Sequence, residues 1–169
     1  FLIRGFPTLA HFRDGVRLPE HAIDMANIER VEVLKGPAAM LYGRIDPGGM
    51  INVITKKPQA TRHYSLQQQF DSYGLFRTAA DATGAITSDG KLAYRLNLSY
   101  LDDKTFRDNS SRDRFFISPS LSWRPLESTE FNLAFEYRDE KLPFDSGLPT
   151  IDNRIVNVPI SRSFHQPGF

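Results

Sequence analysis

The stretch of residues 29–58 restricts the possible folds of this chain more than any other part of its sequence. Apolar and charged residues alternate around Val31 and Val33, which is typical of a half-buried strand. A Gly-Pro pair ends this strand, and residues 38–41 leave room for only about one helical turn. A proline- and glycine-rich turn then leads into residues 50–55, a second strand rich in β-branched side chains. The stretch therefore predicts two strands joined by a compact connection with several glycines.

Charge balance and residue usage argue against several functional classes. The 169 residues include 21 Lys and Arg against 20 Asp and Glu, so the net charge of +1 gives no general attraction to nucleic acid or acidic lipid. Cysteine is absent, which excludes disulfides, thiolate metal sites and a cysteine nucleophile within these residues. No apolar run approaches the roughly 20 residues of a membrane-spanning helix. A membrane barrel stays open, because its strands alternate between apolar and polar residues.

A second pattern begins after residue 61, where five segments of roughly 9–11 residues alternate between apolar and polar side chains. In the clearest segment, apolar residues alternate with polar ones: Leu92, Tyr94, Leu96, Leu98 and Tyr100 against Arg95, Asn97 and Ser99. The last segment repeats the pattern across residues 131–138. The length of these segments is the length that a tilted strand needs to cross a membrane.

Alternation alone fits both a soluble β-sandwich and a membrane barrel, because in either fold one face of each strand is apolar. Two features favour the barrel. Aromatic side chains such as Tyr94 and Tyr100 lie near both ends of the apolar faces, as in the girdles of membrane barrels. Short connections such as residues 88–90 also alternate with long polar ones such as residues 102–113. The short connection at residues 72–74 is an exception, because this topology places it on the side of the long loops.

Several pieces of the first 58 residues match one protein family, in the right order and spacing. The pieces are Ile3–Phe6, Asp14–Arg17, Ile28–Pro37, Leu41–Gly43 and Pro47–Pro58. Together they closely resemble the C-terminal half of the plug domain of TonB-dependent outer-membrane receptors, particularly those for ferric siderophores. The resemblance implies that residues 1–58 are the C-terminal part of a plug domain. Residues 59–169 would then begin a transmembrane β-barrel, with about five strands and their loops.

The fold implied for the whole protein is an antiparallel transmembrane β-barrel of about 22 strands with the α/β plug domain inside it. The five strands cannot close such a barrel, and an open sheet edge is not tolerated in lipid. We therefore expect this chain to be an internal fragment of a longer receptor. By the resemblance, the contact with TonB belongs to an N-terminal segment outside it.

No residue pattern in the chain is typical of catalysis or of a resident metal ion. The histidines His11, His21, His63 and His165 lie far apart, without a zinc-binding motif or paired carboxylates. The glycines do not form a phosphate-binding motif. We therefore expect no catalytic residue, no metal site and no cofactor, and transport rather than an enzymatic reaction.

Arg4 is the leading candidate for contact with a ligand. Ferric siderophores are oxygen-rich and often anionic, and a guanidinium group offers a rigid fork of donors that stays charged. The resemblance implies that the arginine of the matching motif lies near the plug apex, where it can touch the ligand. The alternative is a structural Arg4 paired with a carboxylate of the barrel wall. The resemblance also implies that one loop contacts the ligand, an inference that rests only on the position of the loop in the plug. The loop consists of Arg17, Leu18, Pro19, Glu20 and His21.

Five charged residues gather within the family-like stretch: Glu29, Arg30, Glu32, Lys35 and Arg44. One interpretation is an ordinary solvated face. The resemblance suggests instead ion pairs between plug and barrel, because unpaired charge buried in a barrel lumen is costly. The wall residues that we consider as partners are Arg95, Glu136 and Arg138.

The resemblance implies a receptor that takes up a ferric siderophore across the outer membrane of a Gram-negative bacterium. The ligand is captured between plug apex and outer loops, and an inner-membrane complex acting through TonB supplies the energy. Its partners are then the ferric siderophore, TonB and outer-membrane lipid, with no nucleic acid. Alternatives within the family are receptors for haem, cobalamin or a glycan. Outside it, a passive porin-like channel and a soluble β-sandwich binding module remain, and an occluding plug argues against the channel.

Overall fold

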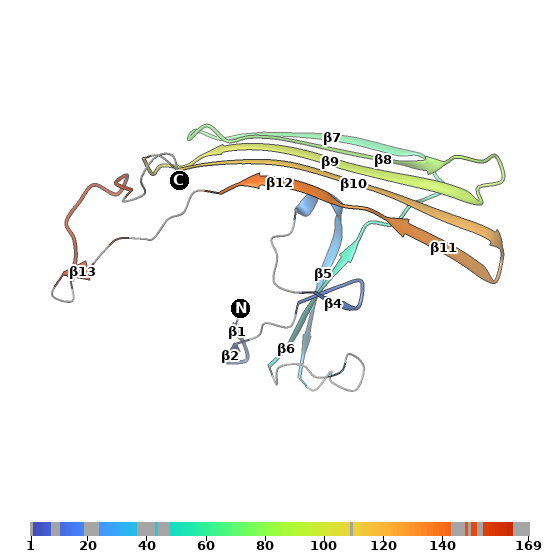
Figure 1. The fold of residues 1–169 in the computed structure, drawn as a ribbon, viewed down its shortest axis with the longest axis horizontal. Coiled ribbons are helices and arrows are strands. Elements are labelled where there is room, and N and C mark those ends of the chain that lie inside the picture. Colours follow the sequence, from blue (N-terminus) through green and yellow to red (C-terminus); the bar gives the residue numbers. More distant parts are fainter. Residues whose placement is uncertain are drawn as a thin grey trace. The chain divides into compact units, whose positions relative to one another are not determined.

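The computed structural model describes residues 2–7, 11–18, 24–36, 43, 48–108, 110–142, 148, 150–151 and 154–163 (Figure 1). The chain divides into two compact units, Phe1–Pro58 and Gln59–Phe169. Both units are built mainly from β-strands. Across the described residues, no helix is both long enough and apolar enough to span a membrane.

The first unit contains a four-stranded sheet in the order β4-β3-β6-β5. These strands are β3 (His11–Arg13), β4 (Val16–Leu18), β5 (Ile28–Lys35) and β6 (Gly49–Thr55). The β3–β6 pair is parallel, and the other two pairs are antiparallel. A 3-10 turn, η1 (Met25–Asn27), leads into β5, and Asp24 caps it by accepting a hydrogen bond from the Ala26 amide.

A small apolar core joins three strands of this sheet. Phe12 of β3 and Met50 of β6 are buried together, and Leu34 of β5 packs against them. Gly49 allows β6 to approach β5 at its first residue, because a Cβ there would clash with the Leu34 carbonyl oxygen. Its φ of +134° also favours glycine.

The two strands predicted within residues 29–58 are confirmed as β5 and β6, which pair in antiparallel fashion. The burial of β5 differs from the prediction. Val31 and Val33 are both exposed, and the more protected face of the strand carries Glu32 and Leu34. The predicted helical turn at residues 38–41 lies outside the described residues.

The described residues of the first unit include two tight hairpins. Arg4-Gly5 joins β1 (Leu2–Ile3) to β2 (Phe6–Pro7), and Asp14-Gly15 joins β3 to β4. All four linking residues have positive φ, with values of 53°, 81°, 48° and 82° in chain order. Two-residue turns with positive φ at both positions match the twist of the strands that they join. Arg4 and Asp14 are therefore held at the tips of hairpins.

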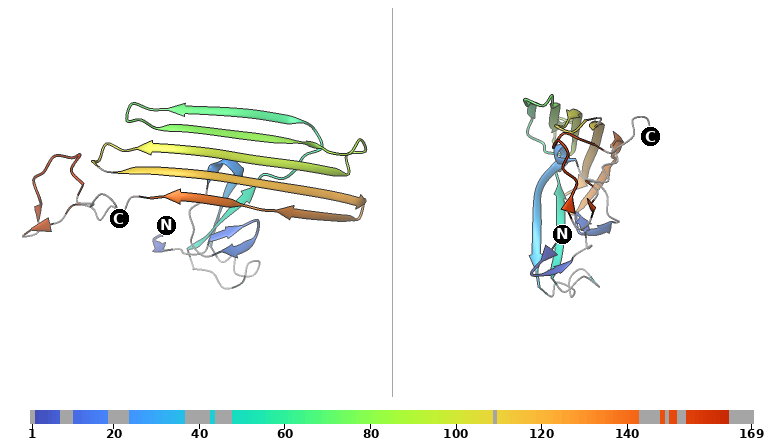
Figure 2. Two further views of the ribbon diagram at one scale, coloured as in Figure 1. Left: turned by 45° about the horizontal axis from the view of Figure 1, so that its top comes forward. Right: turned by 90° about the vertical axis from the view of Figure 1, so that its left-hand side faces the viewer.

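The second unit contains an antiparallel sheet whose strands follow one another in sequence order (Figure 2). The strands are β7 (His63–Phe70), β8 (Phe76–Ala85), β9 (Leu92–Lys104), β10 (Ser111–Leu126), β11 (Thr129–Ala134) and β12 (Tyr137–Lys141). β10 pairs with β9 on one side and with both β11 and β12 on the other. A separate hairpin consists of β13 (Thr150–Ile151) and β14 (Arg154–Ile155). The predicted alternating segments are confirmed as strands.

The last predicted segment, residues 131–138, is interrupted between β11 and β12. The register against β10 is the same on both sides of the break, so no residue is inserted there. Pro119 of β10 faces the break, and its carbonyl accepts a hydrogen bond from the Phe135 amide at 3.0 Å. Proline has no N–H to donate in return, so the ladder loses one bond at this point.

The two faces of this sheet have the polarity opposite to that of a soluble protein. The alternation predicted for β9 is confirmed, but its polar residues are the buried ones, with Asn97 1% and Ser99 0% exposed. On the apolar face, Leu96 and Tyr100 are 36% and 42% exposed. A soluble sandwich buries its apolar face, whereas a membrane barrel exposes it to lipid.

Aromatic side chains gather on the apolar face near both ends of the strands. At one end, Trp123 of β10 stacks on Phe131 of β11 with ring centroids 5.6 Å apart. At the other end, Phe76 of β8 meets Phe70 of β7 and Tyr100 of β9 edge to face, at 5.5 and 6.4 Å. This distribution is the one predicted from the sequence and is typical of interfacial girdles.

Candidate functional site

Arg4 lies at the tip of the β1–β2 hairpin with an exposed side chain. Its φ of 53° is uncommon for a residue other than glycine, so the turn rather than the residue's own preference sets this backbone. The guanidinium lies beside Gly36, because a Cβ on Gly36 would be 3.7 Å from Arg4 Nη1. An exposed guanidinium at a defined hairpin tip is accessible to an anionic ligand, and its contact with one stays a prediction.

Arg17 and Leu18, the first two residues of the predicted ligand loop, belong to strand β4 and not to a loop. Arg17 pairs with Phe12 and Leu18 with His11 across the β3–β4 hairpin. The Arg17 side chain is exposed and that of Leu18 is half-buried. The other residues predicted for this loop lie outside the described residues: Pro19, Glu20 and His21.

Asp14 clamps the β3–β4 hairpin to the end of β6. Its carboxylate accepts hydrogen bonds from the Thr55 hydroxyl at 2.6 Å and the Thr55 amide at 3.0 Å, and it pairs with Lys57 Nζ at 3.3 Å. The Asp14 amide donates to the Val53 carbonyl at 2.9 Å. Partial burial alone would raise the pKa of Asp14, but the Thr55 hydrogen bonds and the Lys57 charge together hold it below its ordinary value.

A chain of hydrogen bonds continues from this clamp across β6 to β5. The Gly15 amide donates to Asn52 Oδ1 and Asn52 Nδ2 donates to Glu32 Oε2, both at 3.1 Å. Glu32 in turn binds Arg30, with Nη2 and Oε1 2.8 Å apart. The buried amide of Asn52 thereby connects the hairpin tip to two charged residues of β5.

These contacts include two of the five residues that were predicted to form ion pairs between plug and barrel. Arg30 and Glu32 bind each other within the first unit, while Glu29 and Lys35 are exposed on β5. Arg44 lies outside the described residues. An exposed pair such as Arg30–Glu32 contributes little stability alone. Contact of any of the five with a barrel wall stays a prediction.

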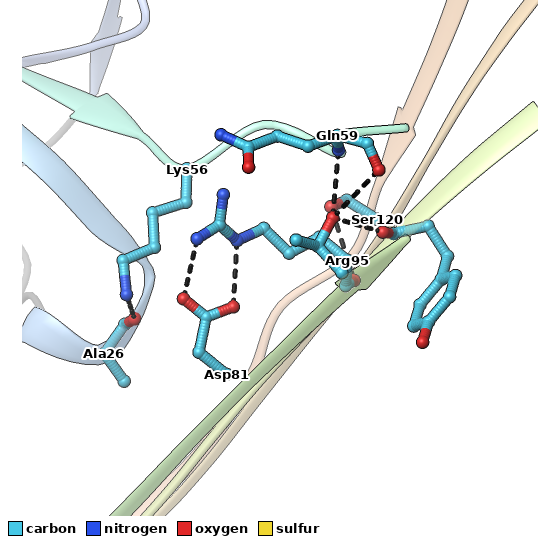
Figure 3. A network of polar contacts seen from close by, with 8 residues as sticks. Ala26, Lys56, Gln59, Asp81, Arg95 and Ser120 are labelled. Carbon is cyan, nitrogen blue, oxygen red and sulfur yellow. Dashed lines mark hydrogen bonds and ion pairs between the residues drawn. The ribbon is translucent and has the colours of Figure 1, made fainter. Parts of the chain in front are cut away.

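The buried face of the second sheet holds an ion pair of its own. Arg95 of β9 donates from Nε and Nη2 to the two carboxylate oxygens of Asp81 of β8, at 2.9 and 2.7 Å (Figure 3). Both side chains are buried, at 6% and 7% exposure. Arg95, considered above as a wall partner for plug charges, therefore has a bidentate partner within the wall itself. The sequence did not point to Asp81 as the partner of Arg95, because the alanine-rich segment around it alternates only weakly between apolar and polar side chains.

Further charge pairs lie along the same face. Arg114 and Arg138 each contact Glu140 at 3.5 Å. Arg112 contacts Asp103 at 3.1 Å. Except for the Arg138–Glu140 contact within β12, these pairs join neighbouring strands. Arg114 and Glu140 are largely buried, and removing one partner of a buried pair is costly, so this pair favours one relative position of β10 and β12.

The start of the second unit is fixed to β8 through a buried hydroxyl. The Gln59 amide donates to Thr83 Oγ1 at 2.9 Å, and Thr83 Oγ1 donates to the Tyr94 carbonyl at 2.7 Å. The Ala85 amide donates to the Ala60 carbonyl at 3.1 Å. Figure 3 shows the Gln59 contacts close to the Asp81–Arg95 pair. These bonds determine where the chain joins the sheet.

The apolar face carries a shallow hollow of about 390 Å³, lined by Leu92, Leu121, Trp123, Phe131, Asn132 and Leu133. Its mostly apolar lining suits hydrocarbon better than an anionic metal complex. Within the described part of the chain, no three His, Cys, Asp or Glu side chains gather as a metal ion requires.

Comparison with known proteins links both units to one family. Residues 1–50 match the TonB-dependent Receptor Plug Domain family. The chain is 41% identical over 147 residues to the metal-pseudopaline receptor CntO of Pseudomonas aeruginosa, an alignment that covers 87% of this chain and 21% of that protein. It is 32% identical over 161 residues to the ferrioxamine receptor of Yersinia enterocolitica, covering 90% of this chain and 22% of that protein.

Solved structures give the same result for the fold. The pyoverdine outer membrane receptor FpvA of Pseudomonas aeruginosa PAO1, bound to pyoverdine, is similar with a TM-score of 0.87 at 25% identity. The similarity covers 95% of this chain and 26% of that chain. The chain spans about a fifth of the length of the curated relatives it matches, 21% and 22% in the two cases above.

The predicted fold class is confirmed by these neighbours, which are outer-membrane barrel receptors with a plug, whereas the count of about 22 strands stays a prediction. Receptors of this kind are outer-membrane proteins of Gram-negative bacteria. The plug match and the exposed apolar face of the strands that follow agree with each other. The chain therefore belongs to the TonB-dependent receptors.

Proposed function

We propose that the receptor containing this chain takes up a metal–chelator complex, with ferric siderophores as the leading class, across the outer membrane. Residues 1–58 form the C-terminal part of its plug domain. Residues 59–169 form the first strands of its barrel, which has about 22 strands in all. The observation that carries the proposal is a plug-family match followed in one chain by a sheet whose apolar face is exposed.

The proposed process is transport, so no bond is made or broken and no catalytic residue or resident cofactor is needed. The ferric siderophore is cargo. TonB, drawing on an inner-membrane complex, acts on a segment N-terminal to the residues of this chain and moves the plug. The hydrogen-bonded chain from Gly15 through Asn52 and Glu32 to Arg30 is polar, so it can rearrange under load without exposing a large apolar core.

The proposed ligand contacts are Arg4, Arg17 and the loop after β4. Arg4 supports this assignment best, because its exposed guanidinium stands at the tip of a two-residue hairpin. Guanidinium binds the planar, anionic oxygen groups of a chelate through a rigid fork of donors. Arg17 adds a second exposed cation on the β3–β4 hairpin, which the Asp14 clamp holds to β6.

A second candidate cargo is a metal complex of pseudopaline or of a similar chelator. The relative named for metal-pseudopaline is 41% identical over the compared residues, against 32% for the ferrioxamine receptor and 28% for the ferrichrome transporter of Escherichia coli. Much of the specificity of such a receptor lies in loops beyond this chain. Haem, cobalamin and glycans remain further alternatives, followed by a passive channel.

The test uses the full-length receptor in detergent and isothermal calorimetry with metal–pseudopaline, ferrichrome, ferrioxamine B, haem and cobalamin. We expect one chelate to bind saturably and Arg4→Asn to weaken its binding by about 10-fold or more, the scale of a charge-assisted hydrogen bond. Asparagine tolerates positive φ, so the hairpin is preserved. Arg4→Lys keeps the charge without the fork and should give an intermediate affinity.

Binding of haem or cobalamin instead would assign a different cargo to the receptor and leave its assignment as a TonB-dependent receptor unchanged. Full affinity in Arg4→Asn would remove Arg4 from the site and favour its structural role. Binding of none of these compounds would count against metal–chelator uptake itself.

A further inference from the structure

Two connections at one end of the second sheet touch each other through aromatic side chains. The β7–β8 turn and the β9–β10 loop both lie at the end opposite the β8–β9 turn (Figure 2). The ring of Tyr73 in the first connection meets the ring of Phe106 in the second edge to face, with centroids 6.5 Å apart. The guanidinium carbon of Arg107 lies 6.0 Å from the centre of the Phe106 ring.

The β7–β8 turn has a hydrogen-bonded backbone of its own. Asp71 accepts hydrogen bonds on one carboxylate oxygen from the Tyr73 amide at 2.8 Å and the Leu75 amide at 2.9 Å. The hydrogen bond from the Leu75 amide, with those from Tyr73 and Gly74, holds the pKa of Asp71 below its ordinary value. Side chains that cap their own turn in this way fix its conformation. The Tyr73 backbone is therefore well defined.

The β9–β10 loop is longer and is held both by hydrogen bonds of its own and by contacts at its sides. Within the loop, the Thr105 amide donates to the Ser110 carbonyl, and the Arg107 amide to the Thr105 hydroxyl, both at 3.2 Å. The Asp108 amide donates to the carbonyl of Ser161, beyond β14, at 2.7 Å. The loop thus lies between the capped turn and a later segment, and contacts both.

We propose that Tyr73, Phe106 and Arg107 form a clasp through which the capped β7–β8 turn positions the β9–β10 loop for ligand capture. The capture role rests on the proposed function and on the predicted topology, which puts the long β9–β10 loop on the outer side of the membrane, where the cargo is captured. A loop that must become ordered when a ligand binds reduces the affinity by the entropy of ordering. A loop already held by the clasp avoids this cost. The three residues are positioning residues, and the short turn at residues 71–75 is the fixed point.

The size of the expected effect follows from the chemistry of the contact. An edge-to-face aromatic pair accounts for about a 2- to 10-fold change in an equilibrium constant beyond the area it buries. Tyr73→Ala removes the ring, whereas Tyr73→Phe keeps it and removes only the hydroxyl. Both substitutions preserve Asp71 and its hydrogen bonds to backbone amides.

The experiment uses the full-length receptor with a nitroxide attached at Asp108→Cys, any cysteine elsewhere in the receptor having been replaced. The Asp108 side chain is exposed, and its backbone amide makes the contact to Ser161. Electron paramagnetic resonance reports loop mobility without ligand, and calorimetry with metal–pseudopaline, ferrichrome and ferrioxamine B reports affinity. We expect Tyr73→Ala to raise the nitroxide mobility and to weaken binding by about 2- to 10-fold. Tyr73→Phe should match the parent receptor in both measurements.

An unchanged nitroxide spectrum in Tyr73→Ala would overturn the clasp. Raised mobility with unchanged affinity would overturn its role in ligand capture. If the parent receptor binds none of the three complexes, the proposed function fails instead, and the nitroxide spectra alone decide whether the clasp holds the loop.

Discussion

Asp14 illustrates how one residue connects two parts of the first unit that lie far apart in sequence. Its carboxylate holds Thr55, 41 residues away, at the end of β6. In Asp14→Asn the turn is preserved, because asparagine tolerates positive φ, but the charge-assisted hydrogen bonds are lost. Because these bonds are exposed to solvent and asparagine Oδ1 can still accept one of them, we expect the Thr55 amide of the full-length variant to exchange with deuterium about 2- to 10-fold faster, corresponding to roughly 0.5–1.5 kcal/mol. Hydrogen–deuterium exchange mass spectrometry measures this directly.

Asp89 supplies the matched control, because it also accepts hydrogen bonds within a turn but belongs to the other unit. Asp89→Asn should leave Thr55 exchange unchanged. The clamp should also depend on pH. The pKa of Asp14 lies below its ordinary value of 3.8, so its contribution is complete above that value and is lost as pH falls through the lower folded value. A loss of Thr55 protection centred near neutral pH would contradict this assignment.

The candidate site was predictable where a residue's role follows from its local sequence. The Asp14-Gly15 pair occupies a tight turn, which is the conformation that an Asp-Gly pair between two strands favours. The assignment of Arg17 and Leu18 to a loop was wrong, because both residues pair with β3 across the Asp14-Gly15 turn and so extend strand β4. The clamp on Thr55 and the Asp81–Arg95 pair were not predictable. Each joins residues that only the sheet register brings together.

Pro119 explains the interruption between β11 and β12. Its missing N–H removes the donor that faces the Phe135 carbonyl, and a membrane provides no water to replace it. Pro119→Val supplies the donor and keeps an apolar side chain on the exposed face. We expect the full-length receptor to gain about 0.5–1.5 kcal/mol, the net value of one hydrogen bond. Guanidinium titration of the folded receptor in detergent measures the change.

Pro125→Val is the control for this substitution, because Pro125 lies within the irregular register between Trp123 and Leu126. A proline at an irregular position does not remove a regular ladder bond. Equal gains from the two substitutions would mean that both act through the unfolded chain rather than through the Phe135 carbonyl.

Across both units, the positions of the strands were predicted well from the sequence, and the burial of their faces less well. Period-two alternation located β7 to β10, because side chains on a strand must alternate between faces whatever the surroundings. Alternation does not state which face is exposed. In β9 the aromatic residues at both ends of the apolar face supplied that information, whereas β5 gave no such signal and its valines are exposed. Pro119 removes one hydrogen bond between β10 and the strand beside it, but it leaves the alternation of apolar and polar residues intact, so the pattern did not predict the break between β11 and β12.

The exposed apolar face predicts how the receptor responds to charge at different depths. Leu96 lies near the middle of the β9 apolar face and Tyr100 near its aromatic end, and both are partly exposed. On a lipid-facing surface, Leu96→Arg should cost about 2–4 kcal/mol, whereas Tyr100→Arg should cost at most about 1 kcal/mol. On a water-exposed surface neither charge would cost much, because exposed positions tolerate substitution. Urea titrations of the full-length receptor folding into phospholipid vesicles distinguish the two cases. Equal costs at both positions would remove the lipid-facing assignment on which the barrel interpretation of this sheet depends.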